Sequence, residues 1–234
     1  MKEFQPFFRA KDKFREYEPE FDHGEIDLSF DFTARDHLTL DVSIAAKPLT
    51  IQEDGEAFTY KLNFALESAK LLTSVIGDRD FRRLDGAVFH FHVPVVDGYR
   101  NYTEDSPGWI YLGNYRQFDD LELKLQYLGQ ANFRATIVGN AEMDTNFSID
   151  AVVKFKSVST SAMYLGADID PTPAPVAKNA AEGWTAIAAV PDPIANEFSR
   201  LLNPLDFNLT AHFNTLNEWC YLRGEPKECM PVKN

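Results

Sequence analysis

Apolar and polar residues alternate clearly in the first third of the chain. Apolar side chains occupy every second position between Glu25 and Thr33, and the pattern resumes from Leu38 to Ile44 after the connector 34–36. Side chains on a β-strand point to opposite faces with a period of two, so each run has one apolar and one polar face. Two such runs joined by three residues predict an antiparallel hairpin.

The same alternation predicts further strands along the chain. They cover Leu49–Ile51, Phe58–Phe64, Ala87–Val93, Leu121–Tyr127, Phe133–Ile137, Phe147–Phe155 and Leu205–Phe213. Three of these, between residues 121 and 155, resemble an antiparallel meander that opposes or extends the first sheet. We therefore predict a mainly β protein, built as an antiparallel two-sheet sandwich or a flattened barrel.

Other segments change period and favour two or three peripheral helices. Between Ala65 and Ile76 the apolar residues fit one helical face, and Gly77 is placed to end that helix. Pro193–Leu202 and Leu216–Leu222 favour two more helices near the end of the chain. Near the start, the spacing of apolar residues in 7–15 also allows a short helix.

Composition suggests four consecutive parts. Residues 1–24 form an N-terminal arm that packs aromatic residues onto the main body, and 25–165 form the antiparallel β domain. Residues 166–183 are rich in Pro and Ala without apolar periodicity, which is typical of a linker or long loop. Residues 184–234 are too few for a good core of their own, so we expect a C-terminal extension docked on the β domain.

Charge narrows the classes of partner. The 234 residues include 36 acidic and 23 basic side chains, giving a net charge of −13. This charge disfavours nucleic acid, whose binding depends on Lys and Arg, and it disfavours an anionic membrane surface. It fits plain solubility or attraction to a basic protein.

The expected location is the cytoplasm. The N-terminal residues lack the apolar run of a secretory signal, and no stretch approaches the length of a membrane span. With only Cys220 and Cys229, the chain is not a disulfide scaffold, and free thiols are expected. A bridge between these two cysteines is the alternative and would require an oxidising compartment.

A segment rich in aromatic residues, Asp97–Arg116, is the first candidate site. It contains Tyr99, Arg100, Tyr102, Trp109, Tyr111, Tyr115 and Arg116. Tyr, Trp and Arg are enriched at the hot spots of protein interfaces because each combines a large contact area with a polar group. The segment therefore predicts a protein interface. Aromatic stacking on a sugar, or a loop folded as a lid over a sheet edge, is the alternative.

The pair His90-x-His92 is the second candidate site. Two histidines two positions apart on a strand project from one face, so both can ligate one divalent metal ion. Metal-binding β-barrels of the cupin type use this device, with a glycine upstream, a carboxylate downstream and a later histidine. Asp97 and His212 supply the last two groups, but the upstream glycine is closer than in that family and no second motif surrounds His212. The sequence favours solvent-facing histidines on an amphipathic strand.

These observations leave three hypotheses for function. The first is a non-enzymatic acidic protein-binding module, for example an immunity-type inhibitor that neutralises a basic toxin. The second is a metal-dependent, cupin-like enzyme that uses the His90-x-His92 pair. The third is a β protein that holds a hydrophobic ligand among its nineteen Phe residues. The first is favoured, because the chain lacks a Gly-x-Ser-x-Gly elbow, a phosphate loop and a dinucleotide fingerprint, and no cofactor is expected.

Overall fold

The computed structural model describes residues 4–31, 37–53, 55–72, 80–96, 99–100, 108–163, 175–178, 184–187, 205–214 and 219–227. The chain divides into two compact units. One comprises Met1–Ile26, Leu40–Ala69 and Leu84–Phe155, and the other comprises Asp27–Thr39, Lys70–Arg83 and Lys156–Asn234. Among the described residues, no helix is long and apolar enough to cross a membrane.

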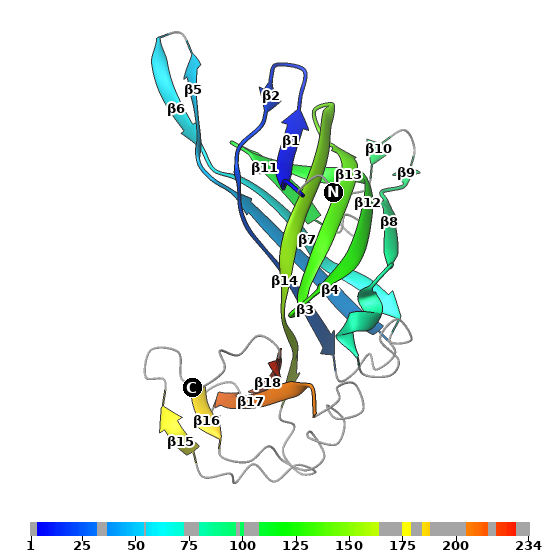
Figure 1. Cartoon of the computed structure of the whole chain (residues 1–234), viewed down its shortest axis with the longest axis vertical. Helices are drawn as coiled ribbons and strands as arrows, with labels where there is room; N and C mark the ends of the chain where they lie inside the picture. Colours follow the sequence, from blue (N-terminus) through cyan, green and yellow to red (C-terminus); the bar gives the residue numbers. More distant parts are fainter. Residues whose placement is uncertain are drawn as a thin grey trace. The chain divides into compact units, whose positions relative to one another are not determined.

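Seven strands of the described chain pair side by side into a closed barrel (Figure 1). Around the barrel they are β13 (Asn132–Ala141), β12 (Tyr115–Gly129), β11 (Gly108–Leu112), β7 (Leu62–Leu72), β4 (His37–Ala46), β3 (Phe21–Asp31) and β14 (Thr145–Met163). Antiparallel pairing of β13 with β14, from Asn132 opposite Lys154 to Ala141 opposite Thr145, closes the ring. The prediction of a mainly β protein is confirmed. Of the two predicted architectures, the structure has a barrel, which is closed, and not a two-sheet sandwich.

Alternating apolar residues on the barrel strands form its core. On β12, Leu121, Leu123 and Leu125 are at most 3% exposed, while the residues between them are at least partly exposed. The β13 residues Phe133 and Ile137 are fully buried in the same way. Burying one face of each strand removes apolar area from water, which is the main driving force for folding. The predicted meander between residues 121 and 155 is confirmed by the register of β12, β13 and β14.

Phenylalanine side chains pack against one another across the barrel. The ring of Phe64 on β7 stacks on that of Phe118 on β12, with centroids 5.0 Å apart. Phe147 on β14 lies 5.3 Å from Phe118 and 6.0 Å from Phe64. These three strands are not neighbours in the barrel order, so the rings meet in its interior. Side chains therefore fill this part of the core.

The predicted peripheral helices are not supported, because the described chain contains almost no helix. Residues 65–72 continue β7 as a strand, with Ala65 opposite Trp109 and Leu66 opposite Gly108. Pairing with β11 outweighs the weaker helical spacing, since strand formation depends on cross-strand neighbours. In the C-terminal part, residues 219–222 belong to β18 (Trp219–Pro226), and 193–202 lie outside the described residues. The described part has one short 3-10 helix, Phe81–Leu84.

The N-terminal arm forms a β-hairpin in place of the short helix. Its strands β1 (Phe7–Lys11) and β2 (Glu16–Tyr17) pair with each other, and β1 also pairs with β14, where Phe8 lies opposite Ile149. Phe8 and Tyr17 are at most 4% exposed. This segment forms a strand and not a helix because alternate residues of β1 are buried against the barrel.

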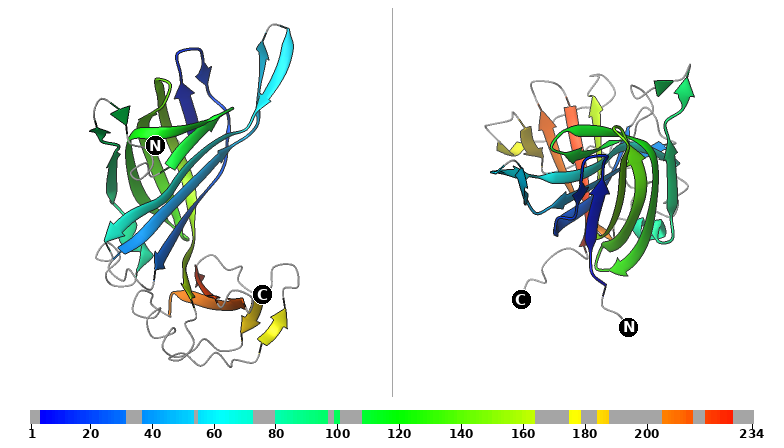
Figure 2. Two further views of the ribbon diagram at one scale, coloured as in Figure 1. Left: turned by 180° about the vertical axis from the view of Figure 1, so that it is seen from behind. Right: turned by 90° about the horizontal axis from the view of Figure 1, so that it is seen from above.

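A second hairpin stands apart from the barrel sheet. Its strands β5 (Leu49–Glu53) and β6 (Glu56–Tyr60) pair with each other in a sheet of their own. The hairpin reaches away from the other strands of its unit (Figure 2). Nearly all of β6 is exposed, and Phe58 has 42% of its surface in solvent.

Three short strands and the C-terminal strands complete the described structure. β8 (Val88–His92) pairs with β12, and β9 (Val95–Val96) pairs with β10 (Tyr99–Arg100). The order β14, β18, β17 (Phe207–Asn214), β16 (Trp184–Ile187) and β15 (Pro175–Lys178) extends the sheet. Within this second unit, Arg82 contacts Asp80 at 2.6 Å and Asp206 at 3.3 Å.

Candidate protein-interaction surface

Three aromatic residues of the predicted interface segment form one cluster. Trp109 and Tyr111 lie on β11, and Tyr115 begins β12 directly opposite Tyr111. The Tyr115 ring meets both others edge to face, with centroids 4.8 Å from Trp109 and 5.0 Å from Tyr111. Edge-to-face packing is favourable for aromatic rings and holds them in fixed positions. Tyr115 is 66% exposed, so the cluster presents an ordered aromatic surface to solvent.

The cluster faces outward because β11 alternates. Ile110 and Leu112 are at most 2% exposed and belong to the barrel core, while Trp109 and Tyr111, which alternate with them, are half-buried. The turn residues between Pro94 and Asn114 predict a long loop here, and residues 108–112 form a strand instead. The signal that indicates the strand is the continuous run of four apolar or aromatic residues from 109 to 112, which ends at the turn residues Gly113 and Asn114.

Arg116, the next residue in the predicted site, is buried and lies outside the exposed cluster. Its Nη2 donates to Oδ2 of Asp12 at 2.7 Å, and its Nη1 donates to Oγ1 of Thr145 at 2.5 Å. Its Nε also donates to Oδ1 of Asn114 at 3.1 Å. This guanidinium therefore joins three turns, those between β1 and β2, β11 and β12, and β13 and β14.

Asp12 completes this network on the N-terminal hairpin. Its Oδ1 accepts the backbone N–H groups of Phe14 and Arg15 at 2.8 and 2.9 Å. Burial by itself raises the pKa of Asp12, but the hydrogen bonds from Arg116 and these two amides outweigh burial, and the pKa lies below its ordinary value. Asp12 is therefore ionised at neutral pH and forms a buried ion pair with Arg116.

Tyr60 joins the β5–β6 hairpin to the turns that Arg116 connects. The guanidinium of Arg15 lies over the rings of Tyr17 and Tyr60, 5.9 and 5.8 Å from their centroids. The Tyr60 ring also packs on Gly113, where a Cβ would lie 2.9 Å from its Cε1 atom. Gly113 has a φ of +91°, which glycine adopts without steric cost.

We call this region the hairpin end: the β5–β6 hairpin together with residues 12–15, 113–115 and 142–144 at the turns of three other hairpins. Large apolar or aromatic side chains gather there. Of the eight that are exposed in the described part of the chain, four belong to it: Phe14 (73%), Phe58 (42%), Tyr115 (66%) and Met143 (51%). Exposed apolar groups scattered singly need no explanation, but a group of them on one region is typical of an interaction site.

Three other residues of the predicted interface are placed less fully. Tyr99 and Arg100 form β10, opposite Val96 and Val95 of β9. Tyr102 lies outside the described residues. The aromatic cluster therefore rests on Trp109, Tyr111 and Tyr115 alone.

His90 and His92 lie on β8, and their side chains are 68% and 65% exposed. His90 faces Glu122 across the strand pair, with Nδ1 3.5 Å from Oε2, and His92 pairs with Asp120 in the same way. Lys124 hydrogen-bonds Glu122 and lowers its pKa. Among the described residues, no group of three or more His, Cys, Asp or Glu side chains is arranged to hold a metal ion.

The remaining two residues of the predicted metal site are not brought to this strand pair by any described contact. Asp97 lies outside the described residues, and the backbone of His212 on β17 pairs with Tyr221 and Ala186.

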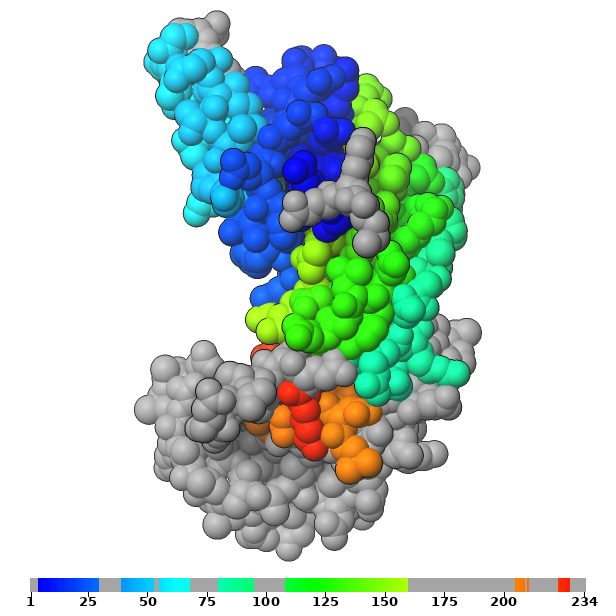
Figure 3. Space-filling view, in the orientation of Figure 1, coloured from blue at the N-terminus to red at the C-terminus, as the bar shows by residue number. Residues whose placement is uncertain are grey.

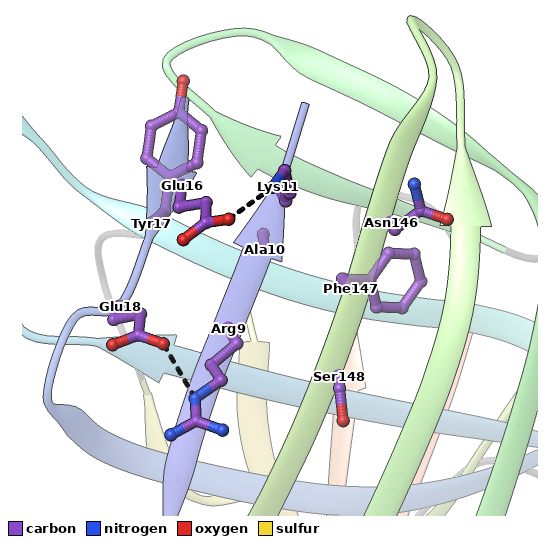
Figure 4. A pocket seen from close by; sticks show the side chains of 9 residues that line it. All are labelled: Arg9, Ala10, Lys11, Glu16, Tyr17, Glu18, Asn146, Phe147 and Ser148. Carbon is purple, nitrogen blue, oxygen red and sulfur yellow. Dashed lines mark hydrogen bonds and ion pairs between the residues drawn. The ribbon is translucent and has the colours of Figure 1, made fainter. Parts of the chain in front are cut away.

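A shallow depression of about 300 Å³ crosses β2, β1 and β14 (Figure 4). Two ion pairs connect the strands at its rim, Arg9 with Glu18 at 2.9 Å and Lys11 with Glu16 at 2.5 Å. The charges at this rim are paired with each other, so the depression shows how the N-terminal hairpin is held rather than a site for a charged ligand.

Comparison of the chain with family models, curated proteins and solved structures yields no match.

Proposed function

We propose that this protein is a non-enzymatic binding module that engages a basic protein partner through the hairpin end. The observation that carries the proposal is the group of exposed Phe14, Phe58, Tyr115 and Met143 side chains on four hairpins. The buried Arg116 network connects three of the turns, so the surface is preorganised. Binding to a preorganised surface loses less conformational entropy, which favours affinity.

Charge supports the choice of a basic partner. A chain with a net charge of −13 attracts a positively charged protein over a distance of about a Debye length, roughly 8 Å at physiological ionic strength. Such attraction mainly accelerates association. An immunity-type inhibitor of a basic toxin is one class of protein with these properties.

Site-specific photo-crosslinking in cells of the protein's own source tests this proposal. A photoreactive residue in place of Tyr115 should crosslink to one dominant protein. The isoelectric point of that captured protein should be basic. The matched control is Leu128, which is 49% exposed at the opposite end of β12. Equal adducts from both positions, or none from Tyr115, would contradict the proposal.

Once the partner is identified, replacing Trp109 by alanine should weaken the affinity of the protein for that partner by about ten-fold or more, as expected for a central aromatic residue. The Trp109 ring packs edge to face on the exposed Tyr115 ring, so its loss removes both contact area and order. Titration calorimetry measures the affinity, and Leu128→Ala serves as the control with unchanged binding. An unchanged affinity for Trp109→Ala would remove the aromatic cluster from the interface.

A further inference from the structure

A groove of about 560 Å³ lies between the two hairpins of the hairpin end. One side is formed by Phe14, Arg15, Glu16 and Glu18, and the other by Leu49, Ile51 and Gln52. Among the described residues that line the groove, none belongs to β1 or β6. The groove therefore lies between β2 and β5, and Figure 3 shows the two hairpins next to each other on the surface.

Both strands present an unpaired edge in the described part of the chain. There β2 pairs only with β1, and β5 pairs only with β6. In an antiparallel ladder, hydrogen-bonded and non-hydrogen-bonded residue pairs alternate. The backbone bond from Asp12 N to Arg15 O closes the first hairpin. The next pair, Lys11 with Glu16, is therefore not hydrogen-bonded, and the backbone groups of Glu16 point to the free edge.

The same reasoning applies to β5. Glu53 lies opposite Glu56 across a two-residue turn, which makes them a hydrogen-bonded pair. Gln52, opposite Ala57, is then a non-hydrogen-bonded position, so its N–H and C=O point away from β6. The groove is thus lined on both sides by backbone donors and acceptors.

Both walls are held in place. Arg9–Glu18 and Lys11–Glu16 ion pairs cross the first hairpin (Figure 4), and Asp12 ties its turn to Arg116. The hydroxyl groups of Thr50 and Thr59 lie 3.1 Å apart across the second hairpin. At the base, Lys47 N donates to the Glu20 carbonyl at 2.8 Å, and the two side chains form an ion pair.

We propose that this groove binds an extended segment of a basic protein partner, which adds a strand between β2 and β5. Adding a strand to a free edge is an established mode of peptide recognition, in which backbone hydrogen bonds supply affinity and alternate side chains supply specificity. Leu49 and Ile51 offer apolar contacts on one wall. On the other wall Glu16 and Glu18 keep their ion pairs with Lys11 and Arg9, so the basic character of the occupant is inferred from the net charge of the whole chain, −13. The segment that fits has alternating apolar and basic side chains.

A second copy of the chain is a poorer occupant. Two molecules that each carry a charge of −13 repel one another, whereas a basic segment is attracted. The basic character of the occupant rests on the proposed function. The strand-accepting geometry stands independently of it.

The probe is a short synthetic peptide of alternating lysine and valine, capped at both ends, titrated against the isotopically labelled full chain by NMR. We expect amide shifts confined to 16–18 and 49–52. Gln52→Pro removes one outward N–H without removing a bond to β6, so it should bind the peptide about ten-fold more weakly than Gln52→Ala, which loses the same side chain but keeps the N–H. Because proline could distort the hairpin, the same peptide with N-methylated valines is also titrated against the unaltered protein, where we again expect weaker binding.

Several results would overturn the proposal: no binding of the peptide, equal binding of its N-methylated form, or equal binding of a glutamate–valine peptide. Self-association of the protein that Gln52→Pro abolishes would instead assign the groove to a second copy. None of these results affects crosslinking at Tyr115, so failure of the groove and failure of the proposed function remain distinguishable.

Discussion

Replacing Asp12 by alanine should lower the free energy of unfolding by about 3–5 kcal/mol, the usual cost of leaving a buried charge without its partner. The side chains of Arg116 and Asp12 are only 6% and 2% exposed, so water cannot substitute for the lost carboxylate. The backbone amides of Phe14 and Arg15 also lose their acceptor. Denaturant titration followed by tryptophan fluorescence measures the change.

The matched control for Asp12→Ala is Glu16→Ala on the same hairpin. Glu16 also forms an ion pair, with Lys11, but both side chains are about two-thirds exposed. Exposed pairs contribute at most about 1 kcal/mol. Equal effects of the two substitutions would show that the Asp12–Arg116 pair is not a buried contact in solution.

Asp12 also makes stability depend on pH. Because its pKa is lower in the folded chain than in the unfolded chain, its contribution is present above the unfolded value near 3.8 and is lost as the pH falls through the folded value. The difference in unfolding free energy between the unaltered protein and Asp12→Asn should therefore be largest near neutral pH and shrink below about pH 4. A difference that stays constant down to pH 2 would contradict this assignment.

Phe118→Ala should cost about 3–5 kcal/mol of unfolding free energy, as expected for truncating a buried aromatic residue. Phe118 is 1% exposed and contacts Phe64 and Phe147, which come from two other strands. Its removal therefore leaves a cavity in the barrel interior. Those strands hydrogen-bond to their own neighbours, so the surrounding rings can fill it only in part.

Phe58→Ala makes the same chemical change on the β5–β6 hairpin and is the matched control for Phe118→Ala. With 42% of its surface exposed, Phe58 should contribute little to stability, within about 1 kcal/mol. Its substitution should instead affect partner binding. A large loss of stability from Phe58→Ala would mean that the β5–β6 hairpin packs against the barrel in solution.

The sequence alone predicts the strands that carry a regular alternation. Leu121, Leu123 and Leu125 mark β12 without ambiguity because every second residue is apolar. The prediction failed between Ala65 and Leu72, where the apolar spacing fits a helical face and the register with Trp109 and Gly108 decides the outcome. Such cross-strand neighbours are not visible in a local pattern.

The candidate site was predictable only in part, for the same reason. Trp109, Tyr111 and Tyr115 were identified by composition, and the structure brings them together. Arginine is common at protein interfaces, so Arg116 was included in the predicted site. Its buried partner Asp12 lies 104 positions earlier in the chain, and no local pattern reveals that contact. Nor does the alternation in β5 and β6 indicate that these strands leave the barrel sheet.

The closure of the barrel by β14 also constrains the order of events during synthesis. Apart from β2, the partner strand of β1 lies in residues 146–150, and β13 completes the ring only with residues 145–154. At about 5–20 residues per second, the ribosome needs roughly 7–30 s to make the chain up to this point. For this time the apolar faces of the earlier strands have no complete core to enter. Newly made chains are therefore expected to depend on chaperones until β14 has emerged, even though the finished barrel does not.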